Sequence, residues 1–293
     1  MISLSFNADD KNLEPSELDA LLQHKPPEFS HIQTQQDDPA LIAFTSGTTG
    51  APKGTIHFHR DVMAMCICVV DELLKPNEDD IFIGSPPMAF TFGLGMLVTF
   101  PLYAGASSVL LEKPNPDNLV IAIEKYKATI CATAPTAYKQ MLKKYHDHDL
   151  SSLKKAVSSG EHLPATVFEE WQARTGIKII NALGSTEMIH MFISAVDDDI
   201  KPGTIGKAIE GYEVCILGSD NLPLGPGNVG RLAGKGPTGC KYLADERQKN
   251  YVVNGWNITG DLCSIDQDGY VRFESRSDDM IISAGYNIAG PEV

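Results

Sequence analysis

The sequence predicts an α/β protein with a mostly parallel sheet and flanking helices, followed by a smaller β-rich, barrel-like subdomain. Between residues 39 and 196, short apolar runs alternate with helical patterns, as in parallel sheets that helices cover on both faces. From residue 197 to residue 275, glycine and proline become dense and short β-rich runs replace the helices, which indicates a small barrel or sheet. Residues 1–38 are polar, and we interpret them as a connector.

The individual elements follow from the spacing of apolar residues. The strands expected in the first part are Leu41–Thr45, Ile81–Ser85, Ser107–Leu111, Thr129–Ala132, Lys155–Ser158 and Lys178–Asn181. The helices expected between them are His59–Leu74, Asn118–Lys127, Thr136–Tyr145 and Pro164–Thr175. The β-rich runs of the second part are Tyr212–Leu217, Gly230–Ala233, Tyr251–Val253 and Tyr270–Glu274. Ligands of parallel α/β sheets bind at the carboxyl ends of the strands, so we expect a site in the loops that follow them.

Composition limits the class of protein and its partners. The 293 residues are 43% apolar and 21% charged, which is typical of a globular chain with a sizeable core. The net charge of −14 argues against a nucleic-acid or anionic-membrane partner, and the apolar runs are too short to span a bilayer. Met1 to Asp10 lacks a secretory pattern, and six scattered cysteines are typical of free thiols in a reducing compartment. We therefore expect a cytoplasmic protein.

The loop from Thr45 to Gly54, with the sequence TSGTTGAPKG, follows the first expected strand and precedes the helix His59–Leu74. Its three glycines allow backbone N–H groups to point at an anion, and four hydroxyls and Lys53 add donors and a positive charge. This chemistry predicts a phosphate-binding loop. A Walker-type phosphotransferase is disfavoured because Gly50 lies only three residues before Lys53, and a glycine follows the lysine.

A second polar segment, with the sequence NALGSTE, follows the strand that ends at Asn181. Thr186 could donate a hydrogen bond to a phosphate oxygen, and the carboxylate of Glu187 is suited to Mg²⁺. The alternative interpretation is a helix N-terminus, with Ser185 or Thr186 as the cap and Glu187 in the first turn. The residues alone favour the helix N-terminus.

TSGTTGAPKG resembles the phosphate-binding signature of the acyl-adenylate-forming enzymes, a family of acyl- and aryl-CoA ligases, peptide-synthetase adenylation domains and luciferases. The later motifs stand in the family's order, and the resemblance covers Leu41 to Val293. It implies the family's large domain in incomplete form, with residues 1–38 as the remnant of an N-terminal subdomain. Residues 276–293 would then contain the hinge and the start of a C-terminal domain. The rest of that domain, which carries the adenylation lysine in the family, would be missing here.

The resemblance implies roles in nucleotide binding. Lys53, Thr186 and Glu187 would be catalytic, with Thr186 at the α-phosphate of ATP and Glu187 at Mg²⁺. The loop residues implied to hold the outer phosphates are Thr45, Ser46, Gly47, Thr48, Thr49, Gly50 and Lys53. The other implied nucleotide-binding residues are Gly160, Glu161, Ala182, Leu183, Thr186, Asp261 and Arg276. Asp278 matches the family's hinge aspartate, and Gly285 matches a glycine that lines the route of coenzyme A.

The string SPPMAFTFGLG, from Ser85 to Gly95, corresponds to one wall of the family's acyl pocket and is similar to that of 2-aminobenzoate–CoA ligases. The chain has Ala89 and Phe90 where many members carry histidine. Leu183 replaces a common tyrosine and, with the run that follows Glu187, resembles the benzoate-type ligases. The residues implied to bind the acid are Phe90, Thr91, Phe92, Gly184 and Met191. An aromatic side chain beside glycines would form a flat slot that suits an aromatic ring.

Together, these features imply an aryl-CoA ligase that activates benzoate or 2-aminobenzoate with ATP and Mg²⁺ and then transfers the acyl group to coenzyme A. The expected partners are small molecules, without nucleic acid or membrane. Three alternatives stay open: a medium-chain acyl-CoA ligase, a carrier-loading adenylation domain, and a catalytically incomplete nucleotide-binding fragment. The pairs His57-x-His59 and His146-x-His148 lack a third ligand and are interpreted as exposed or structural, and His162 as a surface residue.

Overall fold

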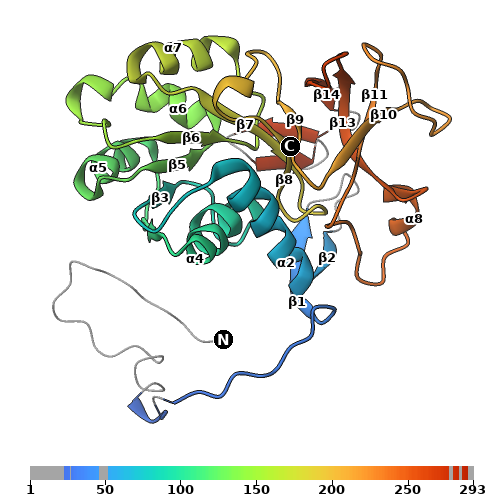
Figure 1. The fold of residues 1–293 in the computed structure, drawn as a ribbon, viewed down its shortest axis with the longest axis horizontal. Helices are drawn as coiled ribbons and strands as arrows, with labels where there is room; N and C mark the ends of the chain where they lie inside the picture. Colours follow the sequence, from blue (N-terminus) through green and yellow to red (C-terminus); the bar gives the residue numbers. More distant parts are fainter. Residues whose placement is uncertain (1–22, 27, 46–51, 277–279, 284–285, 290–293) are drawn as a thin grey trace. The chain divides into compact units, whose positions relative to one another are not determined.

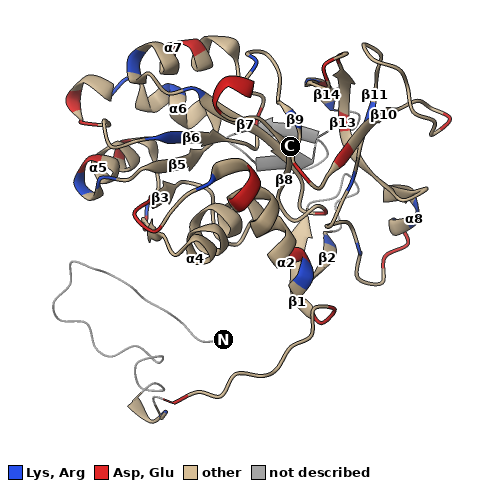
Figure 2. Ribbon diagram, viewed as in Figure 1, with Lys and Arg blue, Asp and Glu red and all other residues tan. Residues whose placement is uncertain are grey.

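The computed structural model describes residues 23–26, 28–45, 52–276, 280–283 and 286–289. The chain divides into two units, residues 1–35 and 36–293, and every described strand lies in the second (Figure 1). Acidic residues are distributed over the elements of that second unit, in keeping with the net charge of −14 (Figure 2). None of the described helices combines the length and apolarity needed to cross a membrane.

The first strand corrects an expectation from sequence. β1 (Pro39–Thr45) is not a buried strand of the parallel sheet, because it pairs antiparallel with β2 (Lys53–Phe58) in a two-stranded hairpin. Ile42 and Phe44 are exposed on β1. The loop is thus followed by a strand and only then by the helix. β2 has no apolar run that would predict a strand, because its two fully buried residues, Thr55 and His57, are polar.

The main sheet has seven strands in the order β4-β3-β5-β6-β7-β8-β9. The five strands expected here are present and parallel, as β3 (Ile81–Gly84), β4 (Ser107–Val109), β5 (Ile130–Thr133), β6 (Lys155–Ser158) and β7 (Ile179–Gly184). Two antiparallel strands were not expected, β8 (Met191–Ser194) and β9 (Lys207–Ala208). β8 is buried on both faces and therefore lacks alternation, and β9 has only two residues.

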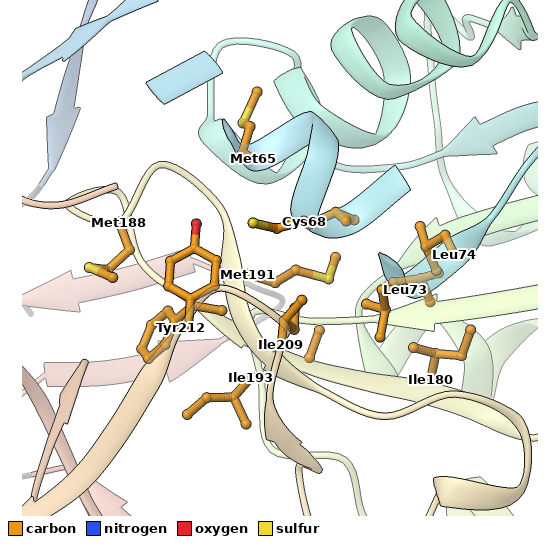
Figure 3. Close-up of a cluster of buried hydrophobic side chains, with 14 of the residues drawn as sticks. Met65, Cys68, Leu73, Leu74, Ile180, Met188, Met191, Ile193, Ile209 and Tyr212 are labelled. Atoms are coloured by element: carbon orange, nitrogen blue, oxygen red, sulfur yellow. The ribbon is translucent and has the colours of Figure 1, made fainter. Parts of the chain in front are cut away.

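Helices cover both faces of this sheet, as expected. One core contains Ile83, Cys131 and Ala156, together with buried residues of α5 (Pro116–Tyr126), α6 (Pro135–Met141) and α7 (Ala165–Thr175). The opposite core contains strand residues that point to the other face of the sheet, such as Phe82 and Ile130. It also contains buried residues of α2 (His59–Cys66) and η1 (Ile67–Leu74), which together form one continuous helix. Tyr212, just before the second sheet, belongs to this same opposite core (Figure 3). The second sheet therefore shares apolar burial with the first.

The second sheet is an open antiparallel one rather than a closed barrel within the described residues, which corrects the barrel-like expectation. Its members are β10 (Glu213–Leu217), β11 (Val229–Lys235), β12 (Val252–Val253), β13 (Trp256–Ile265) and β14 (Val271–Arg276). The order is β10-β11-β13-β12, and β14 also pairs with β13. β13 was not expected as a strand, because its buried Asn257 and Thr259 and its Gly260 broke the apolar pattern and Thr-Gly-Asp resembles a turn. The domain division at residue 197 stays a prediction.

The remaining elements are short. They are α3 (Thr91–Leu94), η2 (Gly95–Thr99), α4 (Phe100–Ala104), η3 (Tyr145–Asp147), η4 (Asp197–Asp199), α8 (Gln248–Tyr251) and the antiparallel pair β15 (Met280–Ser283) and β16 (Tyr286–Ala289). All six cysteines are free, and four of them are buried. This agrees with the thiols expected from the cysteine spacing.

Gly206 joins the two sheets, and its replacement should be unusually costly. Its φ is +123°, it bridges to Val271, and an added Cβ would lie 2.2 Å from the carbonyl carbon of Ser194. Gly206→Ala should lower the free energy of unfolding by about 3 kcal/mol or more, from backbone strain plus overpacking. Gly176→Ala is the matched control, because φ there is +76° but nothing lies within 4 Å of the new Cβ, so it should lose only about 1 kcal/mol. Equal losses in urea unfolding would show that the close approach to Ser194 adds nothing to the cost.

Candidate active site

Two adjoining cavities lie at the carboxyl ends of the parallel strands. The larger, of about 750 Å³, is lined by the residues that directly follow β3, β5, β6 and β7, namely Ser85, Ala134, Ser159 and Ser185. The smaller, of about 130 Å³, shares Ser159 with it and is lined partly by β13 and β14. The site therefore lies where the parallel-sheet pattern predicted one.

The structure brings most of the sequence-predicted residues to these cavities. Those that line the larger cavity are Thr45, Phe90, Thr91, Phe92, Gly160, Gly184, Thr186 and Met191. Those that line the smaller one are Gly160, Glu161, Ala182, Leu183, Gly184, Asp261 and Arg276. Lys53 and Glu187 line neither cavity. The predicted positions Ser46, Gly47, Thr48, Thr49, Gly50, Asp278 and Gly285 lie outside the described residues.

The apolar end of the larger cavity contains His190, a residue to which sequence reasoning gave no role. Its ring packs against Phe92 and edge-on against Phe100, at centroid distances of 5.7 and 4.6 Å. Burial lowers the pKa of His190 to about 4, so the imidazole is neutral at pH 7. Nε2 lies 3.3 Å from the carbonyl oxygen of Phe92 and must therefore carry the proton. Nδ1 is left as a buried acceptor that has no hydrogen-bond partner among the described residues.

Glycines make room for this histidine. A Cβ at Gly95 would lie 2.3 Å from the His190 ring, and a Cβ at Gly184 would lie 2.5 Å from the His190 carbonyl oxygen. Both glycines therefore permit close approach to the wall of the cavity. The sequence feature that could have drawn attention to His190 is a single histidine inside the apolar run Met188–Phe192. Such a residue is as often structural as functional, so the sequence by itself offered no reason to assign it a role.

The smaller cavity has a charged pair at one wall. Asp261 on β13 stands opposite Arg276 on β14, and Nη1 of the arginine donates to Oδ1 of the aspartate over 2.9 Å. Nearby, the carboxylate of Glu161 accepts from the N–H and hydroxyl of Thr136, which lines the larger cavity. His162 is exposed, as expected, but its ring stacks on Phe273 at this cavity.

The segment 185–187 is a turn between β7 and β8 and not the start of a helix, so the helix-cap interpretation is wrong. The turn is held by His57, which is fully buried and donates from Nε2 to the carbonyl oxygen of Thr186 over 2.8 Å. Burial lowers the pKa of His57, so this ring is neutral as well. Of the two sequence interpretations for His57, the structural one is therefore correct.

Lys53 and Glu187 meet at one hydroxyl group. Nζ of Lys53 donates to the phenol oxygen of Tyr242 over 2.8 Å, and this phenol donates to Oε1 of Glu187 over 2.6 Å. Nζ and Oε1 themselves are 3.5 Å apart. Sequence reasoning missed Tyr242, because it lies in an irregular segment far along the chain from both partners. Within the described part of the chain, no group of three His, Cys, Asp or Glu side chains could hold a metal.

Comparison with known proteins agrees with this geometry. A model of the AMP-binding enzyme family matches residues 3–242. The chain is 32% identical to benzoate–CoA ligase of Thauera aromatica over 94% of its own length and 54% of that protein. It is 31% identical to anthranilate–CoA ligase of Pseudomonas aeruginosa over 92% of its own length and 52% of that protein.

A solved structure has a similar fold. The crystal structure of the anthranilate CoA ligase AuaEII with anthranoyl-AMP superimposes with a TM-score of 0.86 and 33% identity, over 95% of this chain and 56% of that one. The chain belongs to the AMP-binding enzyme family, and its fold is that of the large domain of adenylate-forming enzymes. It spans about half the length of the curated relatives it matches.

The neutral state of His190 predicts a loss of stability in acid. The pKa is about 4 in the folded chain against an ordinary 6.5, so the unfolded chain binds a proton first as pH falls. The contribution of the neutral His190 ring to the free energy of unfolding is complete above about pH 6.5 and is lost as pH falls toward 4. Between pH 7 and pH 5, this residue should lower the free energy of unfolding by about 2 kcal/mol.

Urea unfolding of His190→Gln at both pH values measures this contribution, because glutamine does not titrate. The decrease in the free energy of unfolding between pH 7 and pH 5 should be smaller in His190→Gln than in the wild type by about 2 kcal/mol. His146→Gln is the control, because that histidine is exposed and should leave the fall unchanged. Equal falls in the wild type and the His190 variant would contradict the buried neutral state.

Proposed function

We propose that this chain is the nucleotide- and acid-binding part of an aryl-CoA ligase that forms an aryl-adenylate from ATP. One observation carries the proposal: an apolar, aromatic-lined cavity adjoins a smaller one with the Asp261–Arg276 pair, and Gly160 and Gly184 line both. An aromatic acid in the first and a nucleoside in the second would place the carboxylate near the α-phosphate. Thr186 lines the larger cavity close to this junction.

The reaction needs positioning more than covalent help from the protein. A carboxylate is a poor electrophile, so its oxygen attacks the α-phosphorus of ATP and pyrophosphate leaves. The resulting acyl-adenylate carries AMP as a good leaving group, which the thiol of coenzyme A then displaces to give a thioester. Holding the two anionic reactants in line and offsetting their charge supplies most of the rate enhancement. Because the chain spans about half of its relatives, the complete reaction is proposed for the whole protein.

The residues fit distinct parts of this reaction. Asp261 would accept hydrogen bonds from the ribose hydroxyls, with Arg276 holding its carboxylate in place. Thr186 would donate to the α-phosphate, and Lys53 with the loop before it would bind the outer phosphates. Glu187 offers one buried carboxylate beside that lysine. A single carboxylate is sufficient for Mg²⁺, because this ion takes its other ligands from phosphate and water.

The lining of the larger cavity favours an aromatic acid. Phe92, His190 and Met191 provide flat or polarizable surface in the lining, and Gly184 allows the backbone of His190 and Met191 to approach closely. The relatives named for benzoate and anthranilate support the same class. Medium-chain acids and a carrier protein as the acyl acceptor are the alternatives, and coenzyme A, Mg²⁺ and a cytoplasmic location belong to the proposal.

Calorimetric titration with two non-hydrolysable adenylate analogues tests the acid class. The benzoyl analogue should bind at least about tenfold more tightly than the hexanoyl one, because a ring stacks on the aromatic wall and a flexible chain does not. Phe92→Ala should remove most of that preference while binding of AMP stays unchanged. A hexanoyl preference in the wild type would exclude the aryl proposal, and loss of AMP binding in the variant would indicate a damaged fold.

The metal role of Glu187 has a separate test. Mg²⁺ should strengthen ATP binding by the wild-type chain, and Glu187→Ala should remove most of that gain because phosphates alone then hold the ion. Titration of ATP with and without Mg²⁺ measures the gain. Glu170→Ala removes a carboxylate on α7 that pairs only with Arg174 among the described ion pairs, so its gain should match the wild type. An equal gain in the Glu187 variant would exclude this residue as the ligand.

A further inference from the structure

Tyr242 lies beside Lys53 and Glu187 but outside both cavities. Its side chain is buried, with 5% of the residue exposed, and it lines neither the larger nor the smaller cavity. Its phenol oxygen nevertheless contacts both charged groups at the proposed phosphate end, accepting from Lys53 and donating to Glu187. The lysine ammonium also lies 4.8 Å from the centre of the Tyr242 ring.

The backbone around Tyr242 is held against the stem of the loop. The residue forms an isolated β-bridge with Thr55, and the N–H of Leu243 donates to the carbonyl oxygen of Gly54 over 2.8 Å. Its own N–H donates to Oε1 of Gln248 over 2.7 Å. The ring of Tyr251 packs edge-on against that of Tyr242 at a centroid distance of 5.7 Å, and the Lys53 ammonium lies 6.0 Å from the centre of the Tyr251 ring. These contacts fix the phenol relative to β2, from which Lys53 projects.

The phenol also has a defined protonation state. A phenol has an ordinary pKa of about 10, so the hydroxyl of Tyr242 carries its proton at neutral pH, and its distances to Nζ of Lys53 and Oε1 of Glu187 are those of hydrogen bonds. It can therefore donate to the carboxylate and accept from the ammonium at the same time. The ammonium and carboxylate are 3.5 Å apart, whereas a direct charge-assisted hydrogen bond has a length of about 2.7–2.9 Å.

We propose that Tyr242 is a positioning residue that acts through Lys53, keeping its ammonium off Glu187 and available to the outer phosphates of ATP. Without the phenol, ammonium and carboxylate would close into a direct ion pair, and ATP would have to break that pair to reach the lysine. This inference rests on the proposed function. It adds that Tyr242 affects only ligands with phosphates beyond the first, because the proposed function assigns Lys53 to those phosphates and not to the nucleoside.

Tyr242→Phe tests the proposal because it removes one oxygen and keeps the ring on Tyr251. Titrated against ATP with Mg²⁺, the variant should bind about tenfold more weakly, as expected for one charge-assisted hydrogen bond. Its affinity for AMP should stay within about twofold of the wild type. Tyr138→Phe is the matched control, since that buried phenol donates to the backbone carbonyls of Cys131 and Val157 and belongs to the core that contains α5, α6 and α7. It should lower the melting temperature without changing the ATP-to-AMP ratio.

The outcomes separate this inference from the proposed function. If the wild-type chain binds neither nucleotide, the proposed function is overturned and the role of Tyr242 with it. If the wild type binds both and Tyr242→Phe loses both equally, or loses neither, only the role of Tyr242 is overturned. In a Lys53→Met background, Tyr242→Phe should bring no further loss of ATP affinity, and an additive loss would also overturn it.

A second variant serves if Tyr242→Phe does not fold. Gln248→Leu leaves the phenol intact but removes the side chain that holds the N–H of Tyr242 and donates to the carbonyl oxygen of Cys240. It should reproduce the ATP-selective loss in weaker form, about threefold, because the phenol is then less well fixed. Unchanged ATP affinity in that variant would overturn the positioning role.

Discussion

The parallel pairing of β3, β5, β6 and β7 is the constraint on which the site depends. Pairing in parallel register brings the carboxyl ends of these strands to one edge, so residues that directly follow them meet although they are far apart in sequence. Apolar burial on both faces holds the strands in that register. The second sheet shares one of these cores and thereby carries Asp261 and Arg276 to the same edge.

Two buried histidines tie separate segments of the site together. His57 holds the carbonyl of Thr186, and His190 lies against that of Phe92, across sequence separations of 129 and 98 residues. Burial lowers the pKa of both rings, which keeps them neutral, and among the described residues neither Nδ1 atom has a hydrogen-bond partner. Neutral hydrogen bonds therefore hold these segments of the larger cavity, whereas the ion pair of Asp261 and Arg276 lines the smaller cavity, and Lys53 and Glu187 lie outside both.

This separation of neutral and charged regions suits the proposed chemistry. A flat aromatic acid needs an apolar wall, and the phosphates need cations and donors. The two requirements conflict unless different elements meet them. Here α3 and β8 supply the apolar wall, and the hairpin β1–β2 with the segment around Tyr242 supplies the charged end. The family membership rests on the match over residues 3–242 and is independent of the choice of acid.

The sequence by itself determined the fold class, the five parallel strands and the edge at which the site forms, because apolar periodicity reports local burial directly. It also identified many of the residues that line the two cavities, through a resemblance carried by motifs with defined chemistry, but it gave no role to His190. Only the tertiary structure decided that β1 leaves the main sheet for a hairpin, that β13 is a strand, and that Tyr242 stands between Lys53 and Glu187. These features depend on buried polar residues such as Thr55, whose partners lie far along the chain, and no local pattern reports such pairings.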